Sequence, residues 1–296
     1  MKLLYKTEIK NNADTHNLHI KNDHNYIAEG AVVANCHLAK STEITKIFEL
    51  CTKASYKIGV TGTLDNCKTH LNTIIGLTGP INKLNTTKEL MDKGQISKFK
   101  IKCLILDYDK EISKAIKKFK YQDEIKFLVA NKKRNDFIKN LALSLEKTSI
   151  VLVNYIEHGQ EIYNALMNSK YLNGRSVYYI FGAIEGTERE RIRQIVETEQ
   201  NAIIIASSAI MSTGVSIKNL HNIIFAISGK SRIRTLQSIG RVLRLHIDKD
   251  FATLYDIVDN LSYKNHKNYT LRHFLERIKM YNEEKFDYKL INVDFK

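Results

Sequence analysis

The stretch that decides the fold is AIIIASSAIMSTGVSIKNLHNIIFAI, residues 202–227. It begins with the short apolar run 202–206 (AIIIA) and ends with a second one, 222–227 (NIIFAI). Short runs rich in β-branched residues are typical of strands that are buried on both faces of a sheet. We therefore predict two buried strands here, joined by a polar stretch that can carry chemistry.

The same pattern extends outward from this stretch. Further apolar runs predict three more buried strands, at 149–153 (SIVLV), 177–181 (VYYIF) and 252–258 (ATLYDIV). Helical spacing of apolar residues predicts helices between the strands, at 157–169, 187–199 and 231–245. Strand–helix alternation of this kind predicts a parallel sheet covered on both faces. Residues 148–296 are therefore predicted to form one complete α/β domain.

Residues 36–147 contain fewer strand signals. Residues 56–60 (YKIGV) and 99–106 (FKIKCLIL) predict strands, and Ile138, Leu141 and Leu145 mark a helical apolar face. This is too little for an α/β domain of its own. We predict the back half of a domain whose front half is absent from the sequence, with an unpaired sheet edge and an uncovered apolar face.

Composition limits the class of protein. The 296 residues include 46 Lys and Arg against 32 Asp and Glu, a net charge of +14 that suits a nucleic acid partner. A Lys-, Asn- and Ile-rich composition of the kind that AT-rich genes dictate would give the same surplus. No apolar run reaches the ~18 residues of a membrane span. Four cysteines without a CxxC pair predict neither a disulfide scaffold nor a metal site, so we expect a cytoplasmic protein without a membrane partner.

Residues 237–244, QSIGRVLR, fit the pattern QxxGRxxR. On a helix, Gln237, Arg241 and Arg244 lie within two turns, so their polar ends can converge on one ligand. Guanidinium groups stay charged and bind phosphate oxygens bidentately. Two of them that reach across a cleft would stabilise the charge that develops on a transferred γ-phosphate. The alternative is a solvated helix face that carries two arginines.

With its neighbours, this motif resembles superfamily 2 helicases, most closely the UvsW-type recombination helicases of phages. The resemblance covers 36–296, with 61–63 (TGT) as motif III, 151–155 as motif IV, 206–220 as motif V and 236–245 as motif VI. It implies two RecA-like lobes with ATP and Mg²⁺ between them and a nucleic acid strand across them. It also implies that Thr213 and Gly214 contact that strand, that Gln237 binds ATP, and that Arg241 and Arg244 are arginine fingers.

Two parts of a nucleotide-hydrolysing site are missing from this sequence. A phosphate cradle needs a glycine-rich loop with a lysine, and carboxylates must hold Mg²⁺. The tripeptide 229–231 (GKS) lacks the earlier glycine of a cradle, because Ile224 stands in its place. Where a DExH box is expected, the sequence reads Ala34, Asn35, Cys36, His37, so only Cys-His remains. We therefore expect no ATP hydrolysis by the chain alone, and an ATPase role for His37 only once the carboxylates are supplied.

The first 35 residues resemble the C-terminal splicing region of an intein. Residues 15–20 (THNLHI) and 24–35 (HNYIAEGAVVAN) match its strand, its HNF-like triplet, its turn and the apolar strand that ends in Asn before Cys. The thiolate of Cys36 can accept an acyl group. The side-chain amide of Asn35 can then attack its own carbonyl, close a succinimide and cut the chain, with His24 transferring protons.

Two residues depart from the intein pattern. Ala34 stands where a penultimate His is usual, and Asn17 stands where the first strand commonly has Asp. We therefore expect His24 to carry more of the proton transfer. The segment resembles the C-terminal half of a naturally split intein, whose other half follows the helicase front on a second polypeptide. If that front ends in Asp-Glu, ligation to Cys36 and His37 restores a DECH box.

The sequence thus predicts a precursor for protein trans-splicing. It comprises a short β-rich Hint-type intein segment (1–35), a partial first RecA-like lobe (36–147) and a complete second lobe (148–296). Splicing needs no cofactor, and its partner is the N-terminal intein–helicase fragment. The product is expected to be an ATP-dependent phage DNA helicase that acts on branched or single-stranded DNA in recombination. The alternative is a degenerate, non-hydrolysing helicase paralogue that binds nucleic acid; a plain scaffold protein would not need both arginine fingers.

Overall fold

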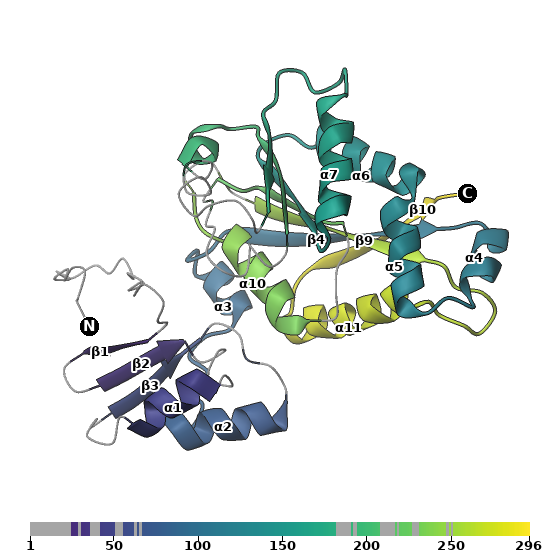
Figure 1. The fold of residues 1–296 in the computed structure, drawn as a ribbon. Helices are drawn as coiled ribbons and strands as arrows, with labels where there is room; N and C mark the ends of the chain where they lie inside the picture. The colour runs from purple at the N-terminus through teal and green to yellow at the C-terminus, as the bar shows by residue number, and fades with distance from the viewer. Residues whose placement is uncertain are drawn as a thin grey trace. The chain divides into compact units, whose positions relative to one another are not determined.

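A computed structural model of the chain describes residues 25–28, 31–35, 42–50, 56–61, 64, 67–181, 191, 194–207, 217, 219–226, 231–246, 249 and 251–296. The chain divides into two compact units, Met1–Leu84 and Asn85–Lys296 (Figure 1). None of the helices within these ranges has the length and apolar content that crossing a membrane requires.

The larger unit is built on a seven-stranded sheet with the order β10-β4-β9-β8-β5-β7-β6. Figure 1 labels its strands β4, β9 and β10. Its strands are β4 (Lys98–Asp107), β5 (Ser149–Val153), β6 (Val177–Ile180), β7 (Ile203–Ser207), β8 (Asn222–Phe225), β9 (Phe251–Asn260) and β10 (Tyr288–Asp294). Every neighbouring pair is parallel, which confirms the predicted parallel sheet. The carboxyl ends of all seven strands therefore meet at one edge of the sheet.

Helices cover both faces of this sheet. They are α3 (Thr87–Asp92), α4 (Lys110–Ile116), α5 (Tyr121–Ala130), α6 (Lys132–Ser144), α7 (Ile156–Met167), α10 (Arg232–Val242) and α11 (Tyr269–Glu283). Leu128, Ile138 and Ile162 from α5, α6 and α7 are buried in the core on one face. Ile239 from α10 and Phe274 from α11 are buried in the core on the other face. Two-sided burial explains why the strands in the middle of the sheet read as continuous apolar runs.

The structure places the boundary between the compact units after Leu84, not after residue 147 as the sequence predicted. The strand predicted at 99–106 is present as β4, but it belongs to the seven-stranded sheet, where it lies between β9 and β10. The pairing with β9 joins residues about 150 positions apart in the chain, for example Phe99 with Ala252, and the pairing with β10 joins residues still further apart, for example Ile101 with Tyr288. An apolar run predicts a strand but carries no information about such a distant partner.

The smaller unit contains a three-stranded sheet with the order β1-β2-β3. Its elements are β1 (Asn25–Ala28), β2 (Ala31–Asn35), α1 (Thr42–Leu50), β3 (Tyr56–Val60) and α2 (Lys68–Thr78). The strands β1 and β2 form an antiparallel pair, whereas β2 and β3 are parallel, with Asn35 opposite Val60. The strand predicted at 56–60 is therefore confirmed as β3.

The smaller unit leaves much of its apolar surface uncovered. Among its described side chains, the buried hydrophobic ones are Phe48 and Ile74. By contrast, Ile58 is 47% exposed, Val60 is 61% exposed and Leu84 is 87% exposed. Ile58 and Val60 are two residues apart on β3 and therefore share one face of the strand. Among the described strands β3 lies at one edge of its sheet, and its side chains Ile58 and Val60 are exposed; that a missing front half covers them stays a prediction.

Candidate functional site

Helix α10 turns one side toward the core and the other side away from it. Thr235, Ile239 and Val242 are buried and repeat at the spacing of a single helical stripe. At 100° per residue, positions 237 and 241 fall on the opposite side of the helix. Gln237 is half-buried there, and the side chain of Arg241 lies outside the described part of the structure. The helix therefore carries the QxxGRxxR positions on the side that the core does not use.

Arg244 lies in the turn that follows α10. Its side chain is exposed, seven residues after Gln237 and so about two helical turns along the same side. Partial loss of hydration lowers the pKa of Arg244, while the nearby carboxylate of Glu197 acts in the opposite direction. A guanidinium stays charged under such conditions, so Arg244 presents a positive group at the end of the helix.

Gly240 keeps the same side of α10 clear. A Cβ atom built at this position would meet no atom within 4 Å. A glycine inside a helix costs about 0.5–1 kcal/mol relative to alanine, and the described residues give no steric reason for it. The absence of a side chain here leaves room for a ligand or another part of the protein to lie against the helix beside Gln237 and Arg244.

Lys249 joins the end of α10 to the segment predicted as motif V. The Lys249 Nζ donates to the carbonyl oxygens of Val242 at 2.7 Å and of Leu220 at 3.3 Å. Burial, together with the charge of Arg244, lowers the pKa of Lys249 to about 8. Carbonyl groups in the last turn of a helix lack partners within the helix, and a lysine can satisfy them. The sequence did not predict a role for Lys249, because a lone lysine in a loop carries no motif.

The turn that holds Arg244 is also fixed by the start of β4. The backbone N–H of Ser97 donates to the Leu243 carbonyl at 2.9 Å, and the Ser97 hydroxyl donates to the Arg244 carbonyl at 3.2 Å. The backbone around Arg244 is therefore held by residues from two segments that are far apart in sequence. These hydrogen bonds go to backbone carbonyls, so they fix the backbone that carries Arg244 without engaging its guanidinium group.

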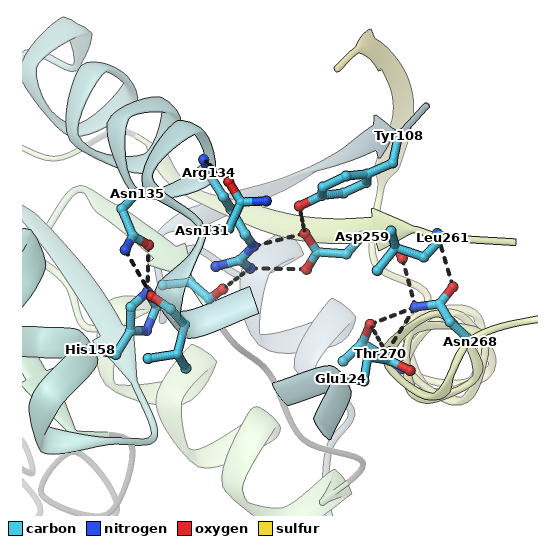
Figure 2. Close-up of polar contacts among 12 residues, drawn as sticks. Tyr108, Glu124, Asn131, Arg134, Asn135, His158, Asp259, Leu261, Asn268 and Thr270 are labelled. Carbon is cyan, nitrogen blue, oxygen red and sulfur yellow. Dashed lines mark hydrogen bonds and ion pairs between the residues drawn. The ribbon is translucent and has the colours of Figure 1, made fainter. Parts of the chain in front are cut away.

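A buried ion pair fixes the carboxyl ends of β8 and β9 (Figure 2). The Arg134 guanidinium donates to both carboxylate oxygens of Asp259, at 2.7 and 3.0 Å, and also to the carbonyl of Ala226. The hydroxyl of Tyr108 donates to Asp259 at 2.9 Å. Ala226 is the last described residue before 227–230, the stretch that leads into α10. Arg134 therefore anchors the point from which the motif VI segment departs.

Two neighbouring groups are structural (Figure 2). His158 contacts Asn135 through Nε2 and Oδ1 at 3.0 Å, and burial followed by the charge of Arg134 lowers the pKa of His158 to about 3. His158 is therefore neutral at ordinary pH and holds α7 against α6. Glu124 accepts from the backbone N–H groups of Tyr269 and Thr270, both at 2.8 Å, at the first turn of α11.

The structure locates some of the predicted site residues. Asn35 ends β2, Gln237 and Arg241 lie in α10, and Arg244 follows that helix. His24, Cys36, His37, Thr213 and Gly214 lie outside the described residues. Across the described ranges, no three His, Cys, Asp or Glu side chains are grouped to hold a metal ion. The chemical roles of all these residues stay predictions.

Comparison with known proteins supports the helicase resemblance. Residues 132–246 match the helicase conserved C-terminal domain family. The chain is 35% identical over 272 residues to the ATP-dependent DNA helicase UvsW of Enterobacteria phage T4, an alignment that covers 88% of this chain and 53% of UvsW. The crystal structure of T4 UvsW is similar with a TM-score of 0.59 and 31% identity, and the chain again covers 53% of it. Residues 132–246 thus resemble a helicase C-terminal domain, and the chain has UvsW-like homology over about half the length of UvsW.

More distant structures share the fold alone. The Type ISP restriction-modification enzyme LlaBIII bound to DNA has a TM-score of 0.64 at 12% identity, covering 89% of this chain and 22% of the enzyme. Dbp5 of S. cerevisiae bound to RNA and ADP BeF3 has a TM-score of 0.56 at 13% identity, covering 88% of this chain and 59% of Dbp5. With its parallel sheet, the larger unit has an α/β fold that resembles a RecA-like helicase lobe.

Proposed function

We propose that this chain is the C-terminal part of a UvsW-like, ATP-dependent DNA helicase that becomes complete by protein trans-splicing. The observation that carries the helicase part is helix α10. Its side away from the core brings Gln237, Gly240 and Arg244 together, in a chain with 35% identity to an ATP-dependent DNA helicase. A positive, open helix side of this kind fits the phosphates of a nucleotide.

The roles of the chain's residues follow from that fit. Arg241 and Arg244 stabilise negative charge on the transferred phosphate, and Gln237 orients a polar group of the nucleotide or of water. ATP with Mg²⁺ supplies the phosphoryl group and its counter-charge when bound. In this proposal Gln237, Arg241 and Arg244 bind the phosphates, and the partner brings the carboxylates that would hold Mg²⁺. Thr213 and Gly214 contact the DNA backbone. The substrates of the completed helicase are branched recombination intermediates.

The splicing part rests on residues 1–35 and on the junction after them. Asn35 cyclises and cuts the chain, Cys36 accepts the partner's acyl group, and His24 transfers protons. Cys36 and His37 then complete a DECH box with two carboxylates from the partner. A non-hydrolysing paralogue is not favoured, because it requires separate losses of the cradle and the carboxylates and leaves residues 1–35 unexplained.

The backbone of the smaller unit adds a requirement to this proposal. The strand β2 belongs to the segment that splicing removes, and it is the neighbour of β3 in the described sheet. Loss of residues 1–35 takes β2 away and leaves β3 without it. The partner must therefore contribute a strand in place of β2, ending in its two carboxylates directly before Cys36. The exposed Ile58 and Val60 give such a partner an apolar face to cover.

The splicing proposal is tested by intact-mass analysis after mixing the chain with a fragment that carries the helicase front and an N-terminal intein half. We expect a ligated product that lacks residues 1–35. The Asn35→Ala variant should not cleave before Cys36, and Cys36→Ala should not ligate. A product that retains residues 1–35, or normal ligation by Asn35→Ala, contradicts the proposal.

The helicase proposal is tested separately in the ligated enzyme. Arg244→Ala should abolish ATP turnover while DNA binding persists, because the guanidinium acts on the phosphate. The matched control is Arg272→Ala, which removes an exposed arginine on α11 and should leave turnover unchanged. Equal turnover in the wild type and Arg244→Ala refutes the arginine-finger role.

A further inference from the structure

The strand β4 changes its surroundings halfway along its length. In its first half Lys98, Lys100 and Lys102 are exposed, and they alternate with buried residues that face α11. The same face continues with Leu104 and Leu106, which are buried in the core with α5 and α6. Helices therefore cover the carboxyl-terminal half of this face and leave the amino-terminal half open. The open half is lined with lysines.

Neighbouring strands extend this open surface. Phe251 and Tyr255 of β9 lie opposite Lys98 and Lys102, and Lys289 of β10 lies opposite Lys102 on its other side. The ring of Phe251 is 44% exposed. We call Lys98, Lys100, Lys102 and Lys289 the lysine ladder.

Aromatic rings hold the ladder along the sheet. The Nζ of Lys100 lies 4.7 Å from the ring centroid of Phe251, and the Nζ of Lys98 lies 5.6 Å from it. The Nζ of Lys102 lies 5.3 Å from the ring of Tyr255. Cations over aromatic faces are attracted by the ring electrons, so these contacts keep the ammonium groups near the sheet surface.

The charges of the lysine ladder are not balanced within the described structure. Alternate residues of a strand are about 7 Å apart, and like charges on directly opposite residues of neighbouring strands are unfavourable. Lys102 and Lys289 are such a pair. In the described ranges, none of the ladder lysines forms an ion pair with a carboxylate. A regular row of phosphates would relieve this repulsion.

We propose that the lysine ladder and Phe251 bind the backbone of a single-stranded nucleic acid. Proteins that bind single strands without reading their sequence combine a positive track for the phosphates with aromatic rings for the bases, and this surface has both. Ser97, directly before Lys98, is bonded to the turn that carries Arg244. The track therefore starts at the end of α10. The proposal adds a second contact to the proposed DNA binding and requires neither ATP nor splicing.

Fluorescence anisotropy with a labelled oligo-dT tests this proposal on the full unspliced chain, without nucleotide or partner. In the triple variant Lys98→Gln/Lys100→Gln/Lys102→Gln, we expect binding to weaken about tenfold or more at low salt. Losing three phosphate contacts should also reduce the slope of log K against log salt by about 2, at ~0.7 per contact. Binding by the Phe251→Ala variant should be weakened less than binding by the triple variant, and its salt slope should equal that of the wild type.

The control variant Lys117→Gln/Lys118→Gln/Lys126→Gln removes the same charge from three exposed lysines. Lys117 and Lys118 directly follow α4, and Lys126 lies in α5. The control variant should bind within about twofold of wild type. The variant Lys98→Arg/Lys100→Arg/Lys102→Arg should bind like wild type, and circular dichroism should show that all variants fold. Equal affinities of the two triple variants for oligo-dT overturn the proposal. Binding of the wild-type chain to polyglutamate but not to oligo-dT also overturns it, and indicates an acidic protein partner instead. Either failure leaves the splicing proposal intact, because the assay contains no partner fragment.

Discussion

The seven-stranded unit and the three-stranded unit differ in how they treat apolar side chains. Ile150 in β5 is fully buried, whereas Ile58 in β3 is 47% exposed, although both lie in strands with a parallel neighbour. Parallel sheets are usually covered on both faces, and the larger unit follows that rule. The sheet of the smaller unit is mixed, and the described side chains Ile58 and Val60 on its strand β3 are exposed. We interpret the difference as that between a complete lobe and half of one, which awaits its remaining strands.

The largest expected effect concerns the buried ion pair of the complete unit. Arg134→Met leaves the carboxylate of Asp259 buried without its cation, which should cost about 3–5 kcal/mol in urea unfolding. The matched control is Lys88→Met, which breaks an exposed pair with Asp92 and should cost less than about 1 kcal/mol. Similar losses for the two variants would mean that the larger unit does not depend on its buried contacts.

A second pair of variants compares the two units directly. Ile150→Ala removes a fully buried side chain and should destabilise the protein by about 3 kcal/mol. Ile58→Ala makes the same chemical change on an exposed face and should cost less than about 1 kcal/mol. Both are measured by urea unfolding of the full chain. If Ile58→Ala costs as much as Ile150→Ala, the face of β3 is already covered.

Acidification should destabilise the larger unit through His158. Its pKa is about 3 in the folded protein, so it stays neutral, whereas the unfolded chain takes up a proton below about pH 6.5. The unfolded state binds more protons in this window, so stability falls as the pH falls from 6.5 toward 3. His158→Gln should lose about 1.6 kcal/mol less than wild type between pH 6.5 and pH 5 in urea unfolding, because each unit of pKa difference is worth 1.36 kcal/mol and the unfolded imidazole is already half protonated at pH 6.5. Parallel pH profiles for the two proteins would show that His158 is charged when folded.

The smallest effect concerns the side of α10 that the complete unit leaves open. Gly240→Ala meets no atom within 4 Å and should stabilise the chain by about 0.5–1 kcal/mol. In the ligated enzyme it should lower ATP turnover, because the new methyl group occupies the approach to the helix. Gly76→Ala in α2, which is equally unobstructed, is the control and should gain stability without losing turnover. Unchanged turnover in Gly240→Ala would show that nothing approaches this side closely.

The sequence predicted strands and helices better than it predicted which distant residues contact each other. The strands at β5 to β9 were found because burial on both faces leaves continuous apolar runs. The helix α11 was not predicted, since part of its buried face is polar: the Arg277 Nε donates to Asp256 at 2.9 Å, and the Tyr281 hydroxyl donates to Asp256 at 2.9 Å. For the candidate site, a motif revealed Gln237 and Arg244. Lys249 and Arg134 act through distant backbone carbonyls, which a single sequence does not show.

Amide hydrogen exchange at β3 tests the central claim most directly. In the unspliced chain, the amides of Tyr56–Val60 that point away from β2 should exchange rapidly, because the described sheet gives β3 no neighbour on that side. After ligation to the partner fragment, the same amides should become protected, while β5 in the complete unit keeps its protection throughout. Unchanged exchange at β3 after ligation would contradict the account, because the smaller unit would then gain no strand from its partner.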